Sequence, residues 1–305
     1  MLFIYKKLIL LLFVCFALSC TTDNFIEQDL QNSDSEITIS EIPTLLNERS
    51  VTLQNQSYGS ESEQIFDIYL PEERSSNSTK VIILIHGGSW IDGDKSDMED
   101  LIPLLQNANP NHAIVNMNYV LANQTTHAFP NQFFNIQDLL DELTTRSTEL
   151  QITSEFALIG RSAGGHLALM YDYVYDELDR VKMVCTISGP TDFTHPFYIE
   201  RPNFDELFEL LVDTDAYPPN QNLIRKLSPA KRVNLNSSPT IIFHGNNDNI
   251  VPVANARKLK RKLKKKNIPK RLFRFDNEGH GNWSEETMQF VDLKLNRFIN
   301  NHFSI

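Results

Sequence analysis

The sequence predicts an α/β fold in which a mostly parallel central sheet carries helices on both faces. Short, continuously apolar runs indicate strands that are buried on both sides, and they alternate with longer segments of helical periodicity. Such alternation is typical of parallel strands joined by right-handed crossovers. Ten of the eleven glycines fall in groups that follow predicted strands, where ligands bind in open α/β sheets. The sequence therefore also predicts where a site should lie.

The predicted elements succeed one another from residue 65 to the end of the chain. Strands are expected over residues 65–70, 81–85, 113–119, 156–159, 181–188, 240–243 and 272–275. The first of them alternates apolar and polar residues and is expected at an edge of the sheet, whereas 81–85 is apolar throughout and is expected in its centre. Helices are expected over residues 133–150, after 167, after 253 and over 283–303.

Length and charge limit the classes of function. With 305 residues, of which 41% are hydrophobic, the chain can bury the core of one α/β domain, expected over residues 51–305. The net charge of -11 argues against a nucleic-acid partner, because binding to phosphates needs a cationic surface.

Residues 1–20 have the pattern of an export signal. Lys6 and Lys7 precede an apolar stretch over 8–18, which is too short to span a bilayer as a helix. The stretch ends in Ala17-Leu18-Ser19-Cys20 and resembles a bacterial lipoprotein signal, which implies that Cys20 is lipidated and becomes the first mature residue. Ala17 departs from that pattern, where leucine is more common. Plain cleavage near Ser19 and an uncleaved short anchor are the alternatives.

The segment 21–50 is interpreted as a polar tether. It holds seven acidic residues and one basic residue, Arg49, without a sustained apolar period. We therefore expect a protein on the bacterial cell envelope, at its periplasmic or outer-membrane face, with a soluble secreted protein as the alternative. Cys185 lies in an apolar run and would have no partner for a disulfide, so it is expected to be buried and inert.

A Gly-x-Ser-x-Gly motif identifies Ser162 as a candidate nucleophile. The motif is Gly160-Arg161-Ser162-Ala163-Gly164, at the corner between the strand expected over 156–159 and the helix that follows. A serine at such a corner is strained and exposed above the edge of the sheet, as a nucleophile must be. The alternative for the motif on its own is an ordinary glycine-rich turn.

Two further loops after predicted strands supply an acid and a base. Asp248 follows the strand at 240–243, and an aspartate there is well placed to orient a histidine. His280 stands between glycines after the last strand, with no apolar face to pack into, which favours a catalytic role. His86, His166 and His244 are expected to brace loops by hydrogen bonds. No histidines or acids share the spacing of metal ligands, so no metal site is expected.

The loop after the strand at 81–85 is suited to bind an oxyanion. It reads His86-Gly87-Gly88-Ser89-Trp90, and glycines expose backbone N–H donors at low steric cost. In chain order the site then consists of this loop, Ser162, Asp248 and His280.

Four motifs in that order resemble those of α/β-hydrolase esterases. The motifs are H-G-G-x-W at 86–90, G-x-S-A-G-G at 160–165, D-x-x-V-P at 248–252 and the histidine loop at 279–280. They are most similar to the branch that includes hormone-sensitive-lipase-like esterases, arylformamidases, and the acetyl and feruloyl esterases of bacterial polysaccharide degradation. Two positions depart from that branch. An arginine is common at the position of Val120, and a third glycine is common at the position of Ser89.

The resemblance implies an α/β-hydrolase fold and a serine hydrolase that works through an acyl-enzyme without a cofactor. The implied catalytic residues are Ser162, Asp248 and His280. The implied oxyanion hole consists of the N–H groups of Gly88, Ser89 and Ala163.

Residues 193–236 interrupt the alternation of strands and helices and are expected to form a small cap over the site. Their aromatic residues predict that Phe193 and Phe197, together with Trp90, line the substrate pocket. Packing of a helical excursion is an alternative, and it is compatible with a cap.

A small cap predicts an open site with little apolar area for a long acyl chain. We therefore expect short acyl esters, such as acetyl or feruloyl groups on carbohydrates, with acetyl preferred to butyryl. A peptidase similar to prolyl oligopeptidase, an arylformamidase and a non-enzymatic surface-binding protein are the alternatives.

Overall fold

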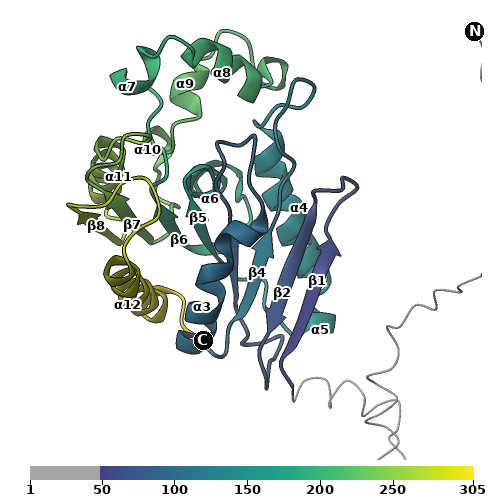
Figure 1. The fold of residues 1–305 in the computed structure, drawn as a ribbon. Helices are drawn as coiled ribbons and strands as arrows, with labels where there is room; N and C mark the ends of the chain where they lie inside the picture. Colours follow the sequence, from purple (N-terminus) through teal and green to yellow (C-terminus); the bar gives the residue numbers. More distant parts are fainter. Residues whose placement is uncertain (1–48) are drawn as a thin grey trace, which may run out of the picture. The chain divides into compact units, whose positions relative to one another are not determined.

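The computed structural model describes residues 49–305 (Figure 1). The expected signal peptide, Cys20 and nearly all of the expected tether lie outside these residues. The described chain forms an eight-stranded sheet in the order β1-β2-β4-β3-β5-β6-β7-β8. The strands are β1 (Val51–Ser57), β2 (Ile65–Leu70), β3 (Val81–Ile85), β4 (Ala113–Met117), β5 (Phe156–Arg161), β6 (Val181–Ile187), β7 (Thr240–Gly245) and β8 (Lys270–Phe275).

The sheet is mostly parallel, as predicted. Only β2 runs against both of its neighbours, β1 and β4, while the strands from β4 to β8 are parallel. The prediction that residues 65–70 form an edge strand is wrong, because β1 covers that side of β2. A register shift in β1 between Leu53 and Gln56, with Asn55 at a φ of 50°, breaks the period of two that would have indicated a strand.

Helices cover both faces of the sheet. They are η1 (Lys95–Leu101), α3 (Ile102–Ala108), α4 (Asn131–Thr145), α5 (Ser147–Leu150), α6 (Ala163–Met170), η2 (Tyr171–Tyr175), α7 (Pro196–Ile199), α8 (Phe204–Leu211), η3 (Thr214–Ala216), α9 (Leu223–Lys226), α10 (Pro229–Arg232), α11 (Ala254–Lys265) and α12 (Glu285–His302). Successive side chains of a strand point to opposite faces, and β3 shows the result. Ile83 belongs to the core that also contains side chains of α4, α6 and α11, whereas Ile82 and Leu84 belong to the core that contains side chains of α3 and α12.

The segment between β6 and β7 forms the cap. It contains α7, α8, η3, α9 and α10, and Figure 1 shows α7, α8 and α9 beyond the carboxyl ends of the central strands. A bridge between Phe129 and Val212 joins the cap to the loop before α4. In residues 49–305 no helix combines the length and the apolar character needed to cross a membrane.

Candidate active site

Ser162 stands at the corner between β5 and α6. Its backbone has a φ of 49° and a ψ of -116°, and its N–H group donates a hydrogen bond to the carbonyl of Ile187. The turn depends on Gly164, because a Cβ atom there would lie 2.1 Å from the carbonyl oxygen of Ile85. A non-glycine residue at positive φ in a tight turn is strained, and such strain is common at functional sites.

The structure brings Ser162, His280 and Asp248 together, from loops that follow β5, β8 and β7. The Nε2 atom of His280 lies 2.9 Å from the Oγ atom of Ser162. The Nδ1 atom of His280 lies 2.8 Å from the Oδ2 atom of Asp248. The three side chains, which are separated by up to 118 residues in the sequence, thus form one hydrogen-bonded chain.

The carboxylate of Asp248 is buried and held on both oxygens. Oδ1 accepts hydrogen bonds from the N–H groups of Ile250 and Val251, at 2.9 Å and 2.8 Å. Oδ2 faces His280 and also lies 3.2 Å from Nε2 of the buried His244. Burial alone would raise the pKa of Asp248, but the hydrogen bonds from His244, His280 and Val251 lower it to below its ordinary value. Asp248 is therefore ionised at neutral pH.

The loop after β3 has an unusual backbone. Gly88, Ser89 and Trp90 have φ values of 102°, 52° and 67°. A Cβ atom on Gly88 would lie 1.7 Å from the carbonyl oxygen of Asp92, so only glycine fits there. The hydroxyl of Tyr119 donates to the carbonyl of Gly87 at 2.9 Å and holds the start of the loop.

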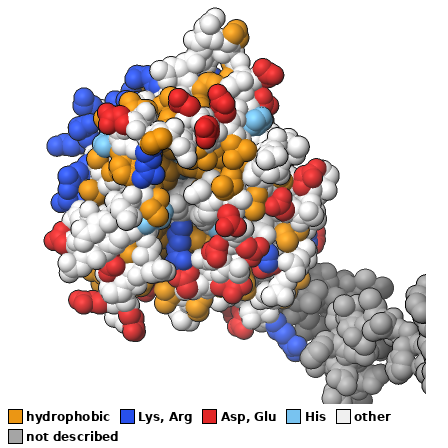
Figure 2. All heavy atoms as spheres, turned by 45° about the horizontal axis from the view of Figure 1, so that its top comes forward, with side chains coloured by type: hydrophobic (Ala, Val, Ile, Leu, Met, Phe, Trp, Pro, Cys, Tyr) orange, Lys and Arg blue, Asp and Glu red, His pale blue; other side chains and the backbone are white. Residues whose placement is uncertain are grey.

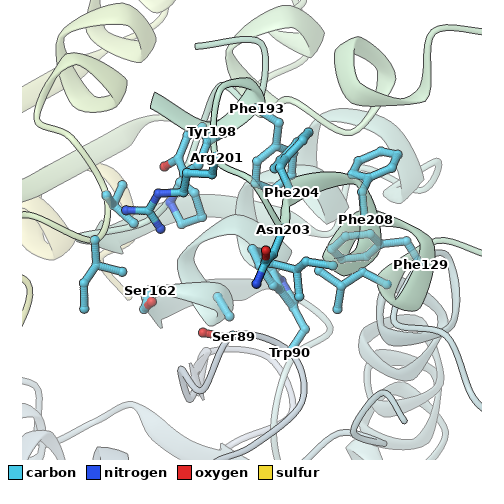
Figure 3. Close-up of a pocket in the computed structure, with 16 residues that line it drawn as sticks. Ser89, Trp90, Phe129, Ser162, Phe193, Tyr198, Arg201, Asn203, Phe204 and Phe208 are labelled. Atoms are coloured by element: carbon cyan, nitrogen blue, oxygen red, sulfur yellow. The ribbon is translucent and has the colours of Figure 1, made fainter. Parts of the chain in front are cut away.

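Two cavities meet at Ser162. The first has a volume of about 390 Å³ and lies under the cap (Figure 3). Its aromatic lining consists of Trp90, Phe129, Phe193, Tyr198, Phe204 and Phe208. The second has a volume of about 540 Å³ and a more polar lining, which includes Gly88, Asp97, Asp100, Arg161, His280 and Trp283. Of the residues expected in the oxyanion hole, Ser89 and Ala163 line the first cavity and Gly88 lines the second.

The expected pocket residues Trp90 and Phe193 line the first cavity, but Phe197 does not. Successive residues of a helix point about 100° apart, and in α7 the neighbouring Tyr198 faces the cavity. Phe197 instead packs against Arg201, whose guanidinium carbon lies 4.0 Å from the centre of its ring. The sequence analysis missed Arg201, although a cation within an aromatic insertion was a visible signal.

The structure does not show the small apolar area that was expected for the site. The cap places several aromatic and aliphatic side chains over Ser162, and hydrophobic side chains gather at the middle of this face of the molecule (Figure 2). The first cavity therefore offers more apolar area than an acetyl group can cover.

Three histidines brace the site, as predicted. One ring nitrogen of each lies close to a backbone carbonyl oxygen, at 2.8 Å for His86 and Gly87, 2.9 Å for His166 and Leu227, and 2.8 Å for His244 and Val251. Burial lowers the pKa of His166 to about 4, so its ring is neutral where it packs beneath Trp90 and Phe193.

Known proteins resemble this chain over most of its described length. The esterase LipC of Mycobacterium tuberculosis is 23% identical over 232 residues, which are 72% of this chain and 57% of LipC. The chain thus spans little more than half of that relative. A bifunctional GH43-CE protein of Bacteroides eggerthii has a TM-score of 0.66 and 20% identity, over 81% of this chain and 38% of that one. An acetyl ester-xyloside bifunctional hydrolase from Caldicellulosiruptor lactoaceticus has a TM-score of 0.62 and 19% identity, over 78% of this chain and 87% of that one.

These likenesses, the strand order and the serine corner show that the fold is that of the α/β-hydrolases. The model of the BD-FAE family matches residues 66–263, from within β2 to the last turn of α11. Because this match covers more than half of the sequence, the chain belongs to the BD-FAE family.

Proposed function

We propose that this protein is a serine carboxylesterase that hydrolyses acyl esters of carbohydrates. The observation that carries the proposal is the hydrogen-bonded chain from Asp248 through His280 to Ser162. A nucleophile, a base and an acid that orients the base are the groups that acyl transfer needs, and they stand here in the geometry it requires. The esterase LipC, to which the chain is similar, supports the same reaction class.

In the proposed reaction Ser162 is the nucleophile and His280 the general base. Asp248 accepts the hydrogen bond from Nδ1–H of His280, which leaves the lone pair of Nε2 directed at the Ser162 hydroxyl. The Oγ atom attacks the acyl carbonyl while its proton passes to His280. His280 then gives this proton to the leaving alcohol, and the acyl-enzyme forms. Water attacks the acyl-enzyme with the same base and releases the carboxylic acid.

Backbone N–H groups of Gly88, Ser89 and Ala163 are the proposed donors to the oxyanion. The strained backbone of the loop after β3 supports this role, because it exposes donors without side chains in the way. Ala163 is the first residue of α6, where N–H groups have no partner within the helix.

The two cavities are proposed to receive the two parts of the ester. The leaving alcohol must lie within reach of His280, which lines the second cavity together with Trp283, Asp97 and Asp100. An indole ring beside carboxylates suits a hydroxyl-rich alcohol such as a sugar. The acetyl ester-xyloside hydrolase that shares the fold supports a carbohydrate substrate. The aromatic lining of the first cavity favours an acyl group with an aromatic or apolar body, such as feruloyl, over acetyl.

Labelling with a fluorophosphonate, followed by mass spectrometry, tests the proposed function. We expect one label on Ser162 and no label on the Ser162→Ala protein. We also expect hydrolysis of methyl ferulate by the wild type and none by that variant. A folded wild-type protein that neither reacts with the probe nor hydrolyses methyl ferulate or any aryl ester would overturn the proposal and favour the surface-binding alternative.

We also propose that the protein is exported and held on the bacterial cell envelope by a lipid on Cys20. The pattern of residues 1–20 supports this proposal, and those residues lie outside the described part of the chain. Cys185, the one cysteine of residues 49–305, is buried and forms no disulfide. Domain stability then rests on the core and needs no oxidised pair.

A further inference from the structure

In the proposed esterase reaction, on which this inference rests, the first cavity takes the acyl part of the substrate. His280 must give its proton to the leaving alcohol, and its side chain lines the second cavity. The first cavity is lined by Ser162 and by the proposed oxyanion donors Ser89 and Ala163, without His280. The far end of an acyl group bound at Ser162 therefore points under the cap.

Arg201 places a positive charge in the wall of this cavity. It lies in the turn between α7 and α8, and Figure 3 shows its guanidinium extending from the cap on the side of Ser162. The face of the guanidinium packs on the ring of Phe197, with 4.0 Å between the guanidinium carbon and the ring centre. Its hydrogen bond to the carbonyl of Asn249, at 3.4 Å, is at the outer limit of such bonds.

The charge of Arg201 is not neutralised within the part of the chain that the structure describes. None of the ion pairs found among residues 49–305 includes it. The whole protein does not attract anions, since its net charge is -11 and acidic side chains are scattered over the same face (Figure 2). Recognition of an anion in this cavity would thus depend on Arg201 itself.

The chemistry of the cavity determines which acyl group benefits. A neutral acyl chain that fills the cavity displaces water from the side of the guanidinium that faces it. The chain forms no hydrogen bond to replace that water, so its binding there costs free energy. A carboxylate at the end of that chain replaces the lost water with charge-assisted hydrogen bonds. Because Phe197 covers a face of the guanidinium, a carboxylate would approach its edge, where arginine forms its typical paired hydrogen bonds, and would compete there with the long bond to Asn249.

We propose that Arg201 is a specificity-determining residue that binds a carboxylate at the far end of the acyl group. The enzyme then prefers half-esters of dicarboxylic acids to neutral esters of the same length. The rival interpretation is that Arg201 only braces the turn between α7 and α8 through Phe197 and Asn249. A bracing residue would affect stability and would affect all acyl groups alike.

The test compares the binding of two esters to the Ser162→Ala protein, which cannot turn them over. The ligands are the 4-nitrophenyl half-ester of adipic acid and its methyl ester, which have the same acyl chain and differ in the terminal charge. We expect the half-ester to bind about tenfold more tightly, the low end of the contribution of a hydrogen bond between charged groups. Adding Arg201→Gln should bring the ratio of the two dissociation constants to about one, and adding Arg201→Lys should leave an intermediate ratio.

Arg225→Gln is the matched control. Arg225, in α9 of the same cap, is exposed as Arg201 is, but it does not line the first cavity. The Arg225→Gln substitution removes the same charge as Arg201→Gln, and we expect the ratio of the two dissociation constants to stay near tenfold. Equal binding of the two esters, or a ratio that survives Arg201→Gln, would overturn the proposal. So would a loss of affinity for both esters together with a lower Tm. Hydrolysis by the wild type is measured separately, so a failure of the proposed function would be seen there and not in the binding ratio.

Discussion

The Nε2 atom of His244 lies 3.2 Å from the Asp248 oxygen that accepts the hydrogen bond from His280. The side chains of His244 and Asp248 are both fully buried. His244 is the last residue but one of β7, so the strand that carries the acid also carries its support. The orientation of Asp248 is therefore fixed before substrate binds, and its contact with Nδ1 holds the ring of His280 in place.

The first prediction concerns His244 as a positioning residue. His244→Phe keeps a ring of similar shape and removes the Nε2 atom, which lies 3.2 Å from Oδ2 of Asp248 and 2.8 Å from the carbonyl oxygen of Val251. We expect the free energy of unfolding to fall by about 1–3 kcal/mol, since a buried carboxylate loses a partner. We also expect kcat to fall by about tenfold with little change in KM, because the base is less well held. Urea unfolding and steady-state kinetics on one aryl ester measure both. An unchanged kcat would show that His244 supports the fold alone.

The second prediction concerns the hydrogen-bonded chain at Ser162. Ser162→Ala, Asp248→Asn and His280→Ala should each lower kcat by several orders of magnitude, and the effects should not add in the double variants. Circular dichroism should show that each protein remains folded. Glu278 is the acid nearest to His280 in the sequence, but it accepts hydrogen bonds from Ser284 and Thr287 at the start of α12. Substantial activity in Asp248→Asn would contradict the assignment of Asp248 as the acid that orients His280.

The third prediction concerns Asp172, a buried carboxyl group away from Ser162. Its oxygens accept hydrogen bonds from the N–H and hydroxyl groups of Ser238, yet burial raises its pKa to about 7. The unfolded chain has an aspartate pKa of about 3.9, so between pH 4 and pH 7 the folded state binds more protons than the unfolded state. The stability contributed by this group is therefore present at low pH and is lost as the pH rises towards 7.

Asp172→Asn removes this titration. When the pH is lowered from 8 to 5, the free energy of unfolding of the wild type should rise by about 2–3 kcal/mol relative to that of the variant. Urea unfolding at the two pH values measures the difference. Glu209→Gln, at an exposed acid on α8, is the control and should show no such gain. Parallel pH dependence of the wild type and Asp172→Asn would contradict the prediction.

Much of the sheet could be predicted because buried parallel strands are continuously apolar. The runs at β3 and β7 are examples, and their loops carry the glycines and polar residues that meet at Ser162. Strand β1 could not be predicted in this way, since its pattern is polar and the shift near Asn55 breaks its period.

The cap was harder to predict than the sheet. Composition indicated aromatic residues there, but which of them face the cavity depends on where a four-residue helix begins. Tyr198 faces the cavity and Phe197 does not, and an aromatic count cannot distinguish the two. The role that we propose for Arg201 could not be predicted from composition, because it depends on the ring of Phe197 and on the absence of an acidic partner among the described residues.

The fourth prediction concerns the expected lipid on Cys20. Cys20→Ala should release the protein from the envelope or block its processing, because one residue carries the anchor. Detergent partitioning of wild type and variant, expressed in a bacterium that processes lipoproteins, measures this. A wild-type protein found wholly in the aqueous phase would favour the secreted form.

The last prediction concerns the size of the acyl group. A cavity of about 390 Å³ with an aromatic lining should accept an aromatic or medium-length acyl group, so kcat/KM should rise from acetyl towards such groups and then level off. Each additional buried CH₂ is worth about 0.8 kcal/mol, or roughly fourfold in kcat/KM, for as long as there is apolar wall to cover.

Phe208 in α8 forms part of that wall and packs against Phe204, with 5.7 Å between their ring centres. Phe208→Ala should lengthen the preferred acyl chain, and Phe208→Trp should shorten it. Phe134→Ala, on the exposed face of α4 and away from the cavity, should leave the preference unchanged. The measurement is kcat/KM of the wild type and the three variants on a series of p-nitrophenyl esters from acetate to decanoate. If kcat/KM of the wild type still rises beyond eight acyl carbons, the acyl chain must leave the cavity and lie along an apolar surface, as in a lipase, and the cap does not set the limit.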